Sequence, residues 1–270
     1  MKRIGCVVLG AVAMILLGAL PASADERKFT YSNEAKTLPA GTVELEQWAT
    51  VRARKESGEF RQWKLREELE YGFSDRFTGA LYMNWEVETI QDVPGRADER
   101  EAKFEGVSLE GKYKFTDPSA DLLGTLLYAE LSAETDEYEF ELKGVISKSF
   151  GDWTFAYNAV FEVEWEGARD AAGIKRWSHE YQVQNTAGVS LHLLPALAVG
   201  VEAMTRTPYT EDLKDRLETV YFIGPNVHVT TGPLWATLTF LAQVDPQGHN
   251  DLDLNGFTKY EVRLIFGINF

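Results

Sequence analysis

Charged side chains at alternate positions are the feature of this chain that could do chemistry, and Glu162, Glu164 and Glu166 form the clearest run. Successive side chains of a β-strand point to opposite faces, so these carboxylates would share one face of a strand. They could line a water-filled lumen and concentrate cations, or bind a hard cation such as Ca²⁺. Because the chain has 42 acidic and 27 basic residues, we interpret them as wall residues and predict no metal site.

Further Glu, Arg and Lys residues alternate in the same way along other segments. Two interpretations stay open. An acidic lumen would act as a cation-preferring pore, whereas Glu, Arg and Lys on neighbouring strands could pair and fill the interior. The residues expected to line the lumen are Glu46, Arg52, Arg54, Lys64, Arg66, Glu68, Glu86, Glu130, Glu141, Glu162, Glu164, Glu166, Glu202 and Arg263.

The sequence gives no support for a catalytic site. The histidines His179, His192, His228 and His249 lie at spacings that suggest no transition-metal cluster. Outer-membrane phospholipase A, a twelve-stranded barrel, carries a His-x-Ser signature, and none of these histidines has serine at that position. Without a placed nucleophile and base, lipid hydrolysis is the least supported function. We predict no catalytic residue, no cofactor and no enzyme.

The elements that would carry this polar face are β-strands with an apolar opposite face. Residues 153–166 alternate large apolar side chains such as Trp153 and Phe155 with polar ones such as Thr154 and Asn158. The last strand alternates in the same way, apart from Ile265 on its polar side, and ends at Phe270. A bilayer covers such an apolar face directly. A soluble sandwich or lipocalin-like barrel would also alternate but rarely places so many large aromatics outward.

We therefore predict an all-β fold, a transmembrane antiparallel up-and-down β-barrel of about twelve strands with both termini in the periplasm. Most connections alternate between short and long, which places the turns around Asp75 and Asp152 in the periplasm and the loops around Arg96, Ala171 and Asn250 outside. Two connections fit less well, because 116–121 is long for a periplasmic turn and 135–137 is short for an outer loop. The predicted strands are 42–54, 60–73, 77–89, 102–115, 122–134, 138–150, 153–166, 177–192, 197–207, 217–229, 234–244 and 257–270.

The first residues have the pattern of an export signal. Lys2 and Arg3 precede an apolar run from Ile4 to Leu20, and a small-residue cleavage site ends at Ala24. Residues 1–24 are predicted to be a cleaved signal peptide, 25–41 a periplasmic lead-in and 42–270 the outer-membrane barrel domain. The only cysteine lies in the signal peptide. With a formal charge of -15, nucleic acid is an unlikely partner.

Three segments resemble a functionally uncharacterised family of Gram-negative outer-membrane proteins: 38–48, 66–77 and 80–84. The resemblance implies a barrel and carries over no catalytic or binding residue. We expect a monomer in the bacterial outer membrane that contacts lipid and the assembly machinery, which would read Phe270 as its signal. The expected role is a passive, porin-like channel for small cationic or neutral solutes. The alternative is a non-conducting structural or surface-interaction barrel.

Overall fold

The computed structural model describes residues 26–93, 97–169, 173, 175–211, 213, 216–248 and 251–270. The predicted signal peptide and cleavage site lie outside the described residues, as do Arg96, Ala171, His249 and Asn250.

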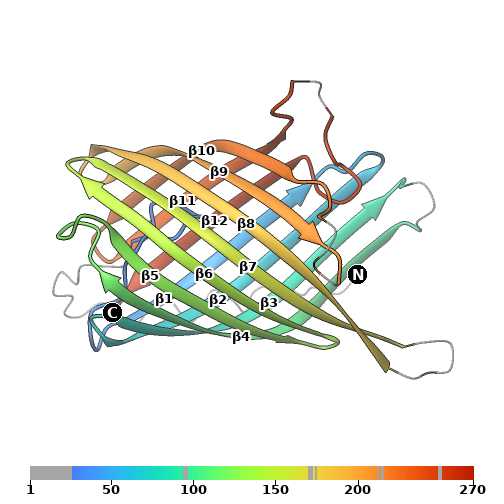
Figure 1. The fold of residues 1–270 in the computed structure, drawn as a ribbon, viewed down its shortest axis with the longest axis horizontal. Coiled ribbons are helices and arrows are strands. Elements are labelled where there is room, and N and C mark those ends of the chain that lie inside the picture. Colours follow the sequence, from blue (N-terminus) through green and yellow to red (C-terminus); the bar gives the residue numbers. More distant parts are fainter. Residues whose placement is uncertain are drawn as a thin grey trace, which may run out of the picture.

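Twelve antiparallel strands close into one barrel in which each strand pairs with its neighbours in the chain and β1 pairs with β12 (Figure 1). The fold class predicted from the alternation is confirmed. In the described part of the chain no helix is long and apolar enough to cross a membrane. The strands are β1 Val43–Ala53, β2 Glu59–Ser74, β3 Phe77–Gln91, β4 Glu99–Thr116, β5 Gly124–Glu134, β6 Glu137–Phe150, β7 Trp153–Arg169, β8 Lys175–Leu194, β9 Leu197–Tyr209, β10 Val220–Thr231, β11 Leu234–Val244 and β12 Tyr260–Asn269.

Each predicted strand has an observed counterpart, and the ends differ by a few residues at most. The predicted strand 234–244 coincides with β11, whereas the strand predicted from 217 begins at Val220. β7 and β8 both extend further than predicted, to Arg169 and from Lys175, because they continue pairing beyond the apolar part of their pattern.

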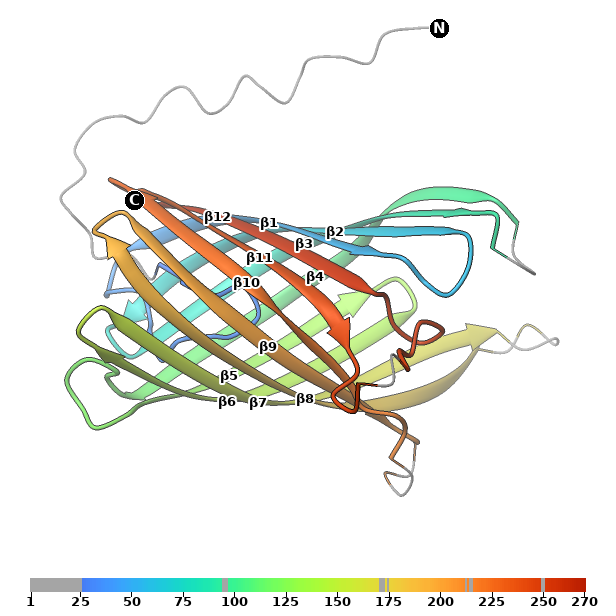
Figure 2. The ribbon, with the colours of Figure 1, turned by 90° about the horizontal axis from the view of Figure 1, so that it is seen from above.

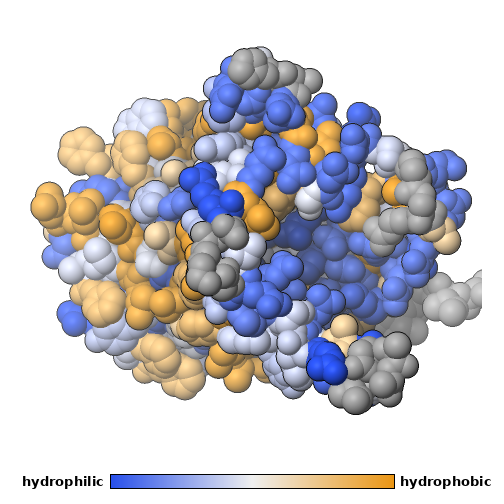
Figure 3. All heavy atoms as spheres, turned by 45° about the vertical axis from the view of Figure 1, so that its right-hand side comes forward, coloured by the Kyte–Doolittle hydropathy of each residue, from blue (hydrophilic) through white to orange (hydrophobic). Residues whose placement is uncertain are grey.

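Alternating burial confirms which face of each strand points outward. On β7, Trp153 and Phe155 are exposed, whereas Thr154 and Asn158 are buried. Large exposed apolar side chains recur around the barrel, at Leu109 and Phe240 for example. Hydrophobic residues therefore cover the outer wall (Figure 3), which suits contact with lipid.

Ile265, the apolar residue on the polar side of the last strand, has a structural explanation. It is fully buried in the lumen and forms a cluster with Trp48 and Trp235. The inward face of the barrel is therefore not uniformly polar.

The carboxyl end of the chain and most of the short turns lie at the same end of the barrel (Figure 2), whereas the short turn between β5 and β6 lies at the other end. The turn between Ser74 and Phe77 and the turn between Phe150 and Trp153 belong to this end, and the backbone of Phe270 pairs there with Val43. We call it the short-turn end and the opposite one the long-loop end. That the short-turn end faces the periplasm stays a prediction.

Candidate functional site

Residues 26–38 fold into the lumen of the barrel, and we call them the inserted segment. In Figures 1 and 2 they form the thin blue trace among the strands. Phe29, Thr30, Ala35 and Leu38 are each 0% exposed. The segment does lead into β1 as predicted, but it lies inside the barrel, where the lead-in interpretation did not place it.

The path of the inserted segment follows from its contacts. Glu26 contacts Thr230 and His228 near the short-turn end of β10. Tyr31 reaches the interior, where it packs with Met204 and Phe222. The chain returns to the short-turn end, and the Leu38 N–H donates to Thr78 Oγ1 at 2.9 Å. The segment is thus a loop inserted from that end.

Glu202 on β9 is the strongest anchor of the inserted segment. Its carboxylate accepts the backbone N–H groups of Thr30 and Tyr31, both at 3.0 Å, and of Ser32 at 2.8 Å. It also accepts the Thr239 hydroxyl at 2.6 Å. A buried carboxylate is tolerated when donors satisfy it, and this one simultaneously satisfies backbone donors that have no strand partner.

Other lumen side chains hold the segment in the same manner. Asn158 accepts the Asn33 N–H at 2.6 Å and donates to the Asn33 carbonyl at 2.9 Å. Ser147 Oγ accepts the Ala35 N–H at 2.8 Å. Because these side chains replace a paired strand, the buried backbone of the segment is hydrogen-bonded without entering the sheet.

Ion pairs within the inserted segment close it into a loop. The Glu34 carboxylate accepts the Lys28 N–H at 3.0 Å and lies 3.3 Å from Lys28 Nζ and 3.0 Å from Lys36 Nζ. Burial by itself would raise the pKa of Glu34, but the charges of Lys36 and Lys28 outweigh it and lower the pKa to about 2. Glu34 therefore stays ionised and joins the two arms of the loop.

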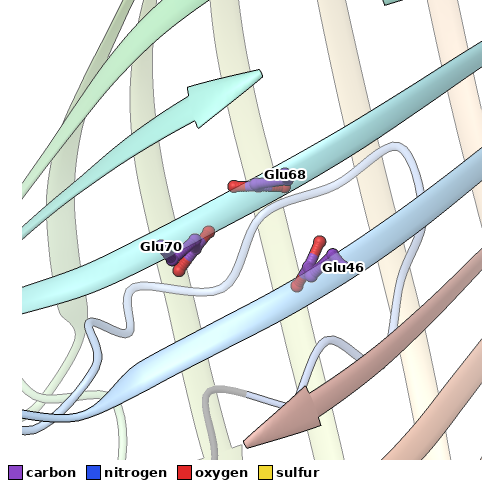
Figure 4. Close-up of side chains that lie close together, drawn as sticks. All are labelled: Glu46, Glu68 and Glu70. Atoms are coloured by element: carbon purple, nitrogen blue, oxygen red, sulfur yellow. The ribbon is translucent and has the colours of Figure 1, made fainter. Parts of the chain in front are cut away.

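An acidic cluster lies beside the segment on β1 and β2. One carboxylate oxygen from each of Glu46, Glu68 and Glu70 lies within 4.8 Å of the others (Figure 4). Lys112 Nζ is 2.5 Å from Glu70 Oε1. Burial would lower the pKa of Arg27 in the inserted segment, but Glu46 and Glu68 raise it above its usual value. Cations of the chain itself therefore balance part of this charge.

Between the inserted segment and the long-loop end lies a cavity of about 770 Å³. Figure 3 shows it as a recess surrounded by hydrophilic side chains. Thr30, Tyr31 and Asn33 of the inserted segment form its floor, and acidic residues outnumber basic ones along its wall. The lumen is thus filled near the short-turn end and hollow beyond it.

Charge is distributed unevenly around this cavity. Strands β5 to β8 contribute eight carboxylates and a single cation, Lys143. Strands β12, β1 and β2, on the other side of the closed barrel, contribute four cations and a single carboxylate, Glu261. The acidic set is Glu130, Glu134, Glu137, Glu139, Glu141, Glu162, Glu164 and Glu180, and the basic set is Arg52, Lys64, Arg66 and Arg263.

Two ion pairs among the described residues each reach across two intervening strands. Arg66 on β2 pairs with Glu130 on β5, and Arg206 on β9 pairs with Glu261 on β12. In each case two strands of the sheet lie between the partners. Such pairs narrow the cross-section of the lumen, so they support the interpretation that paired side chains fill the interior. The cavity beside them supports the interpretation that the barrel is a pore.

The predicted pore-lining residues separate into four groups. Arg52, Lys64, Arg66, Glu130, Glu141, Glu162, Glu164 and Arg263 line the cavity. Glu46, Glu68 and Glu202 are buried beside the inserted segment. Glu86 pairs with Lys64 and Lys103 in the wall. Arg54 and Glu166 are exposed and lie outside the cavity lining.

The sequence interpretation missed the floor of the cavity. Tyr31 and its neighbours belong to a stretch with no strand-like alternation, so no pattern placed them in the lumen. Phe29 and Tyr31 are nevertheless large aromatics within an otherwise polar stretch, and such residues need burial. These two aromatics were the signal in the sequence that could have predicted burial of this segment.

Comparisons with known proteins agree with the fold. The model of a family of unknown function, DUF6662, matches residues 21–270. No curated protein matches the sequence. Among solved structures, the β-domain of the Bordetella autotransporter BrkA is 14% identical with a TM-score of 0.54, covering 86% of this chain and 100% of that one.

The translocator domain of the autotransporter NalP from Neisseria meningitidis is 12% identical with a TM-score of 0.54, and the match covers 85% of this chain and 88% of that one. The NanC porin is 12% identical with a TM-score of 0.49, covering 84% and 98%. The two autotransporter domains are outer-membrane β-barrels, and at such identities the likeness concerns the fold alone.

Proposed function

Because the chain belongs to DUF6662, a family of unknown function, we propose its role from the geometry of the lumen. The protein is an outer-membrane barrel that admits small cationic or neutral solutes to its cavity and is closed toward the short-turn end by the inserted segment. The observation that carries this proposal is the cavity of about 770 Å³ with the inserted segment as its floor.

The charge of the cavity supports the choice of solutes. Acidic residues outnumber basic ones in its lining, and a wall of one charge sign within a low-dielectric surround concentrates ions of the opposite sign. Anions would be repelled on entry. The resulting preference for cationic and neutral solutes is the one that the alternating carboxylates predict.

The contacts of the inserted segment support a closed state that can open. Hydrogen bonds and ion pairs hold this segment in the lumen, and residues 39–42 connect it to β1. The barrel strands pair with one another without using the segment as a strand. Withdrawal of the segment would therefore leave the closed sheet unchanged while it removes the floor of the cavity.

The second candidate is a non-conducting structural or surface-interaction barrel. The observation in its favour is that the short-turn half of the lumen is packed, with Phe29 and Glu202 fully buried and Arg66 bound across the lumen to Glu130. In both candidates the protein is a monomeric outer-membrane protein with no enzymatic activity. Its surroundings are then lipid and, during insertion, the assembly machinery.

Conductance distinguishes the two candidates. We would compare the refolded mature chain, residues 25–270, with a variant that lacks residues 26–36, in planar bilayers. The channel proposal expects little current through the intact protein and discrete, cation-preferring current after the deletion. Heat-modifiable gel mobility of both proteins checks that the barrel has formed. A folded deletion variant without current would favour the structural candidate.

A further inference from the structure

Beside the floor of the cavity, the wall formed by β1, β9 and β12 holds more positive than negative charge within an otherwise acidic lumen. Arg52, Arg206 and Arg263 gather around a single carboxylate, that of Glu261. Arg206 binds Glu261 through two hydrogen bonds, and Arg52 Nε lies 3.6 Å from it. Arg263 makes no ion pair within 4.0 Å among the described residues. Two of the three guanidinium groups thus pair with Glu261, and the third, that of Arg263, has no paired carboxylate among the described residues.

The polar groups that contact Arg263 are uncharged. Its Nε donates to Thr50 Oγ1 at 2.9 Å, and its Nη1 donates to the Thr30 carbonyl at 3.1 Å. Its guanidinium carbon lies 4.1 Å from the centre of the Tyr31 ring. Arg263 is therefore held in place by uncharged partners, and Glu261 acts on its charge from beyond ion-pair distance.

Tyr31 supplies the second observation, which is independent of the charges. Its side chain lines the cavity and is 7% exposed, and its hydroxyl has no hydrogen-bond partner among the described residues. Buried hydroxyl groups are normally hydrogen-bonded, because an unmade bond costs free energy. Beside the three arginines, this buried hydroxyl is a donor that no acceptor of the described residues satisfies.

The opposite wall of the cavity has an excess of negative charge. Within the described part of the chain, Glu139 and Glu164 form no ion pair within 4.0 Å, although both line the cavity. Glu162 accepts hydrogen bonds from Gln182 at 3.2 Å and Gln184 at 3.0 Å, both of them neutral amides. These carboxylates on β6 and β7 can therefore accept a cationic group.

We propose that this cavity is a binding site for small zwitterions, molecules that carry a carboxylate and an ammonium group, as amino acids do. The carboxylate lies toward Tyr31, Arg52 and Arg263, and the ammonium group lies toward the acidic wall of β6 and β7. This inference rests on the proposed function, and it names the solute class: a zwitterion is neutral overall and is not repelled by the acidic entrance.

The two walls explain why both charges are required. A simple cation satisfies the carboxylates but is repelled by the arginines, and a simple anion meets the opposite conflict. A zwitterion places each charge beside its counter-charge, as charge-assisted hydrogen bonds require. Screening by salt should weaken its binding.

Ligand-observed saturation-transfer NMR on the refolded mature chain tests this proposal, with 4-aminobutyrate as the zwitterion and butyrate and butylammonium as single-charge controls. We expect 4-aminobutyrate to bind more tightly than either control. Tyr31→Phe, which removes only the hydroxyl, should weaken its binding about tenfold, the effect of one hydrogen bond to a charged group. Arg52→Gln and Glu164→Gln should also weaken it.

Matched controls lie on the same strands or next to them. Arg54→Gln and Glu166→Gln neutralise exposed residues outside the cavity and should leave binding unchanged. Equal binding of butylammonium and 4-aminobutyrate, unaffected by Tyr31→Phe and Arg52→Gln, would overturn the proposal in favour of a simple cation site. No binding of 4-aminobutyrate to a correctly folded barrel would also overturn it.

This experiment tests the zwitterion site independently of the proposed channel function. Binding is measured at equilibrium and needs no current through the barrel. Binding of 4-aminobutyrate by a barrel that never conducts would support the zwitterion site and reject the channel. Current through the deletion variant without zwitterion binding to the intact protein would support the channel and reject the zwitterion site.

Discussion

The Glu202 carboxylate on β9 accepts the backbone N–H of Tyr31 at 3.0 Å, although 171 positions of the chain separate the two residues. This contact and its two neighbours, from Thr30 and Ser32, hold the inserted segment inside the lumen. We expect the proposed closed state of the barrel to depend on them.

Glu202→Ala should release the inserted segment while the barrel stays folded. Each hydrogen bond to the charged carboxylate contributes roughly 1.5–3 kcal/mol, so loss of three should raise the population of the open state by tenfold or more. The measurement is the rate of maleimide labelling at Ser32→Cys, a near-isosteric change at a position that is 1% exposed. Glu166→Ala serves as the control, and equal labelling rates in the two variants would contradict the prediction.

Gly188 on β8 should be required for closure, because a Cβ atom there would lie 2.6 Å from ring carbons of Phe29. Gly188→Ala should therefore raise labelling at Ser32→Cys. Phe29→Ala also weakens closure, through lost burial worth about 3–5 kcal/mol. The double variant should be no more open than Phe29→Ala alone, because the colliding ring is gone. Additive effects would show that Gly188 acts in another way.

Ion selectivity should follow the acidic wall. In the variant lacking residues 26–36, reversal potentials in a KCl gradient should show cation preference that weakens with salt, since screening lengths fall from about 10 Å at 0.1 M to about 3 Å at 1 M. Glu162→Lys and Glu164→Lys should shift the preference toward anions. Glu166→Lys, at an exposed site outside the cavity lining, should have little effect. Anion preference without these changes would refute the acidic-pore proposal.

Membrane orientation can be tested with single cysteines, because Cys6 is the only cysteine and lies in the predicted signal peptide. Cysteine at Glu56, in the exposed connection between β1 and β2, should be labelled on intact cells by an impermeant maleimide. Cysteine at Asp75 or Asp152, in the short turns, should be labelled after the outer membrane is opened. The reverse pattern would place the short-turn end outside.

Phe270 should matter for assembly more than for the stability of the finished barrel. Its side chain is 52% exposed on the outer face, and its backbone N–H donates to the Val43 carbonyl at 2.9 Å. Phe270→Asp keeps this backbone contact and removes the aromatic end. Lower amounts in the outer membrane are expected, measured against a Phe240→Asp control at another exposed aromatic. Unchanged amounts of Phe270→Asp would argue against an assembly signal.

What the sequence determined by itself is the barrel, because alternation is a local property. Trp153 and Phe155 point outward and Thr154 and Asn158 inward whatever the rest of the chain does, once the segment is a strand. Twelve such segments with short and long connections predict the closed sheet and the inward residues. The alternation along each strand therefore predicted the inward direction of several residues that line the cavity, including Arg52, Glu162 and Glu164.

Only the tertiary structure decided what those inward residues do. Residues 26–38 have no periodic pattern, and contacts with distant residues such as Glu202 and Asn158 hold them in the lumen. Whether Arg206 pairs with a neighbouring strand or reaches Glu261, with two strands between them, depends on the curvature of the closed barrel. Alternation states which face a side chain occupies, but a partner across the lumen is fixed by three-dimensional distance, which local sequence does not encode.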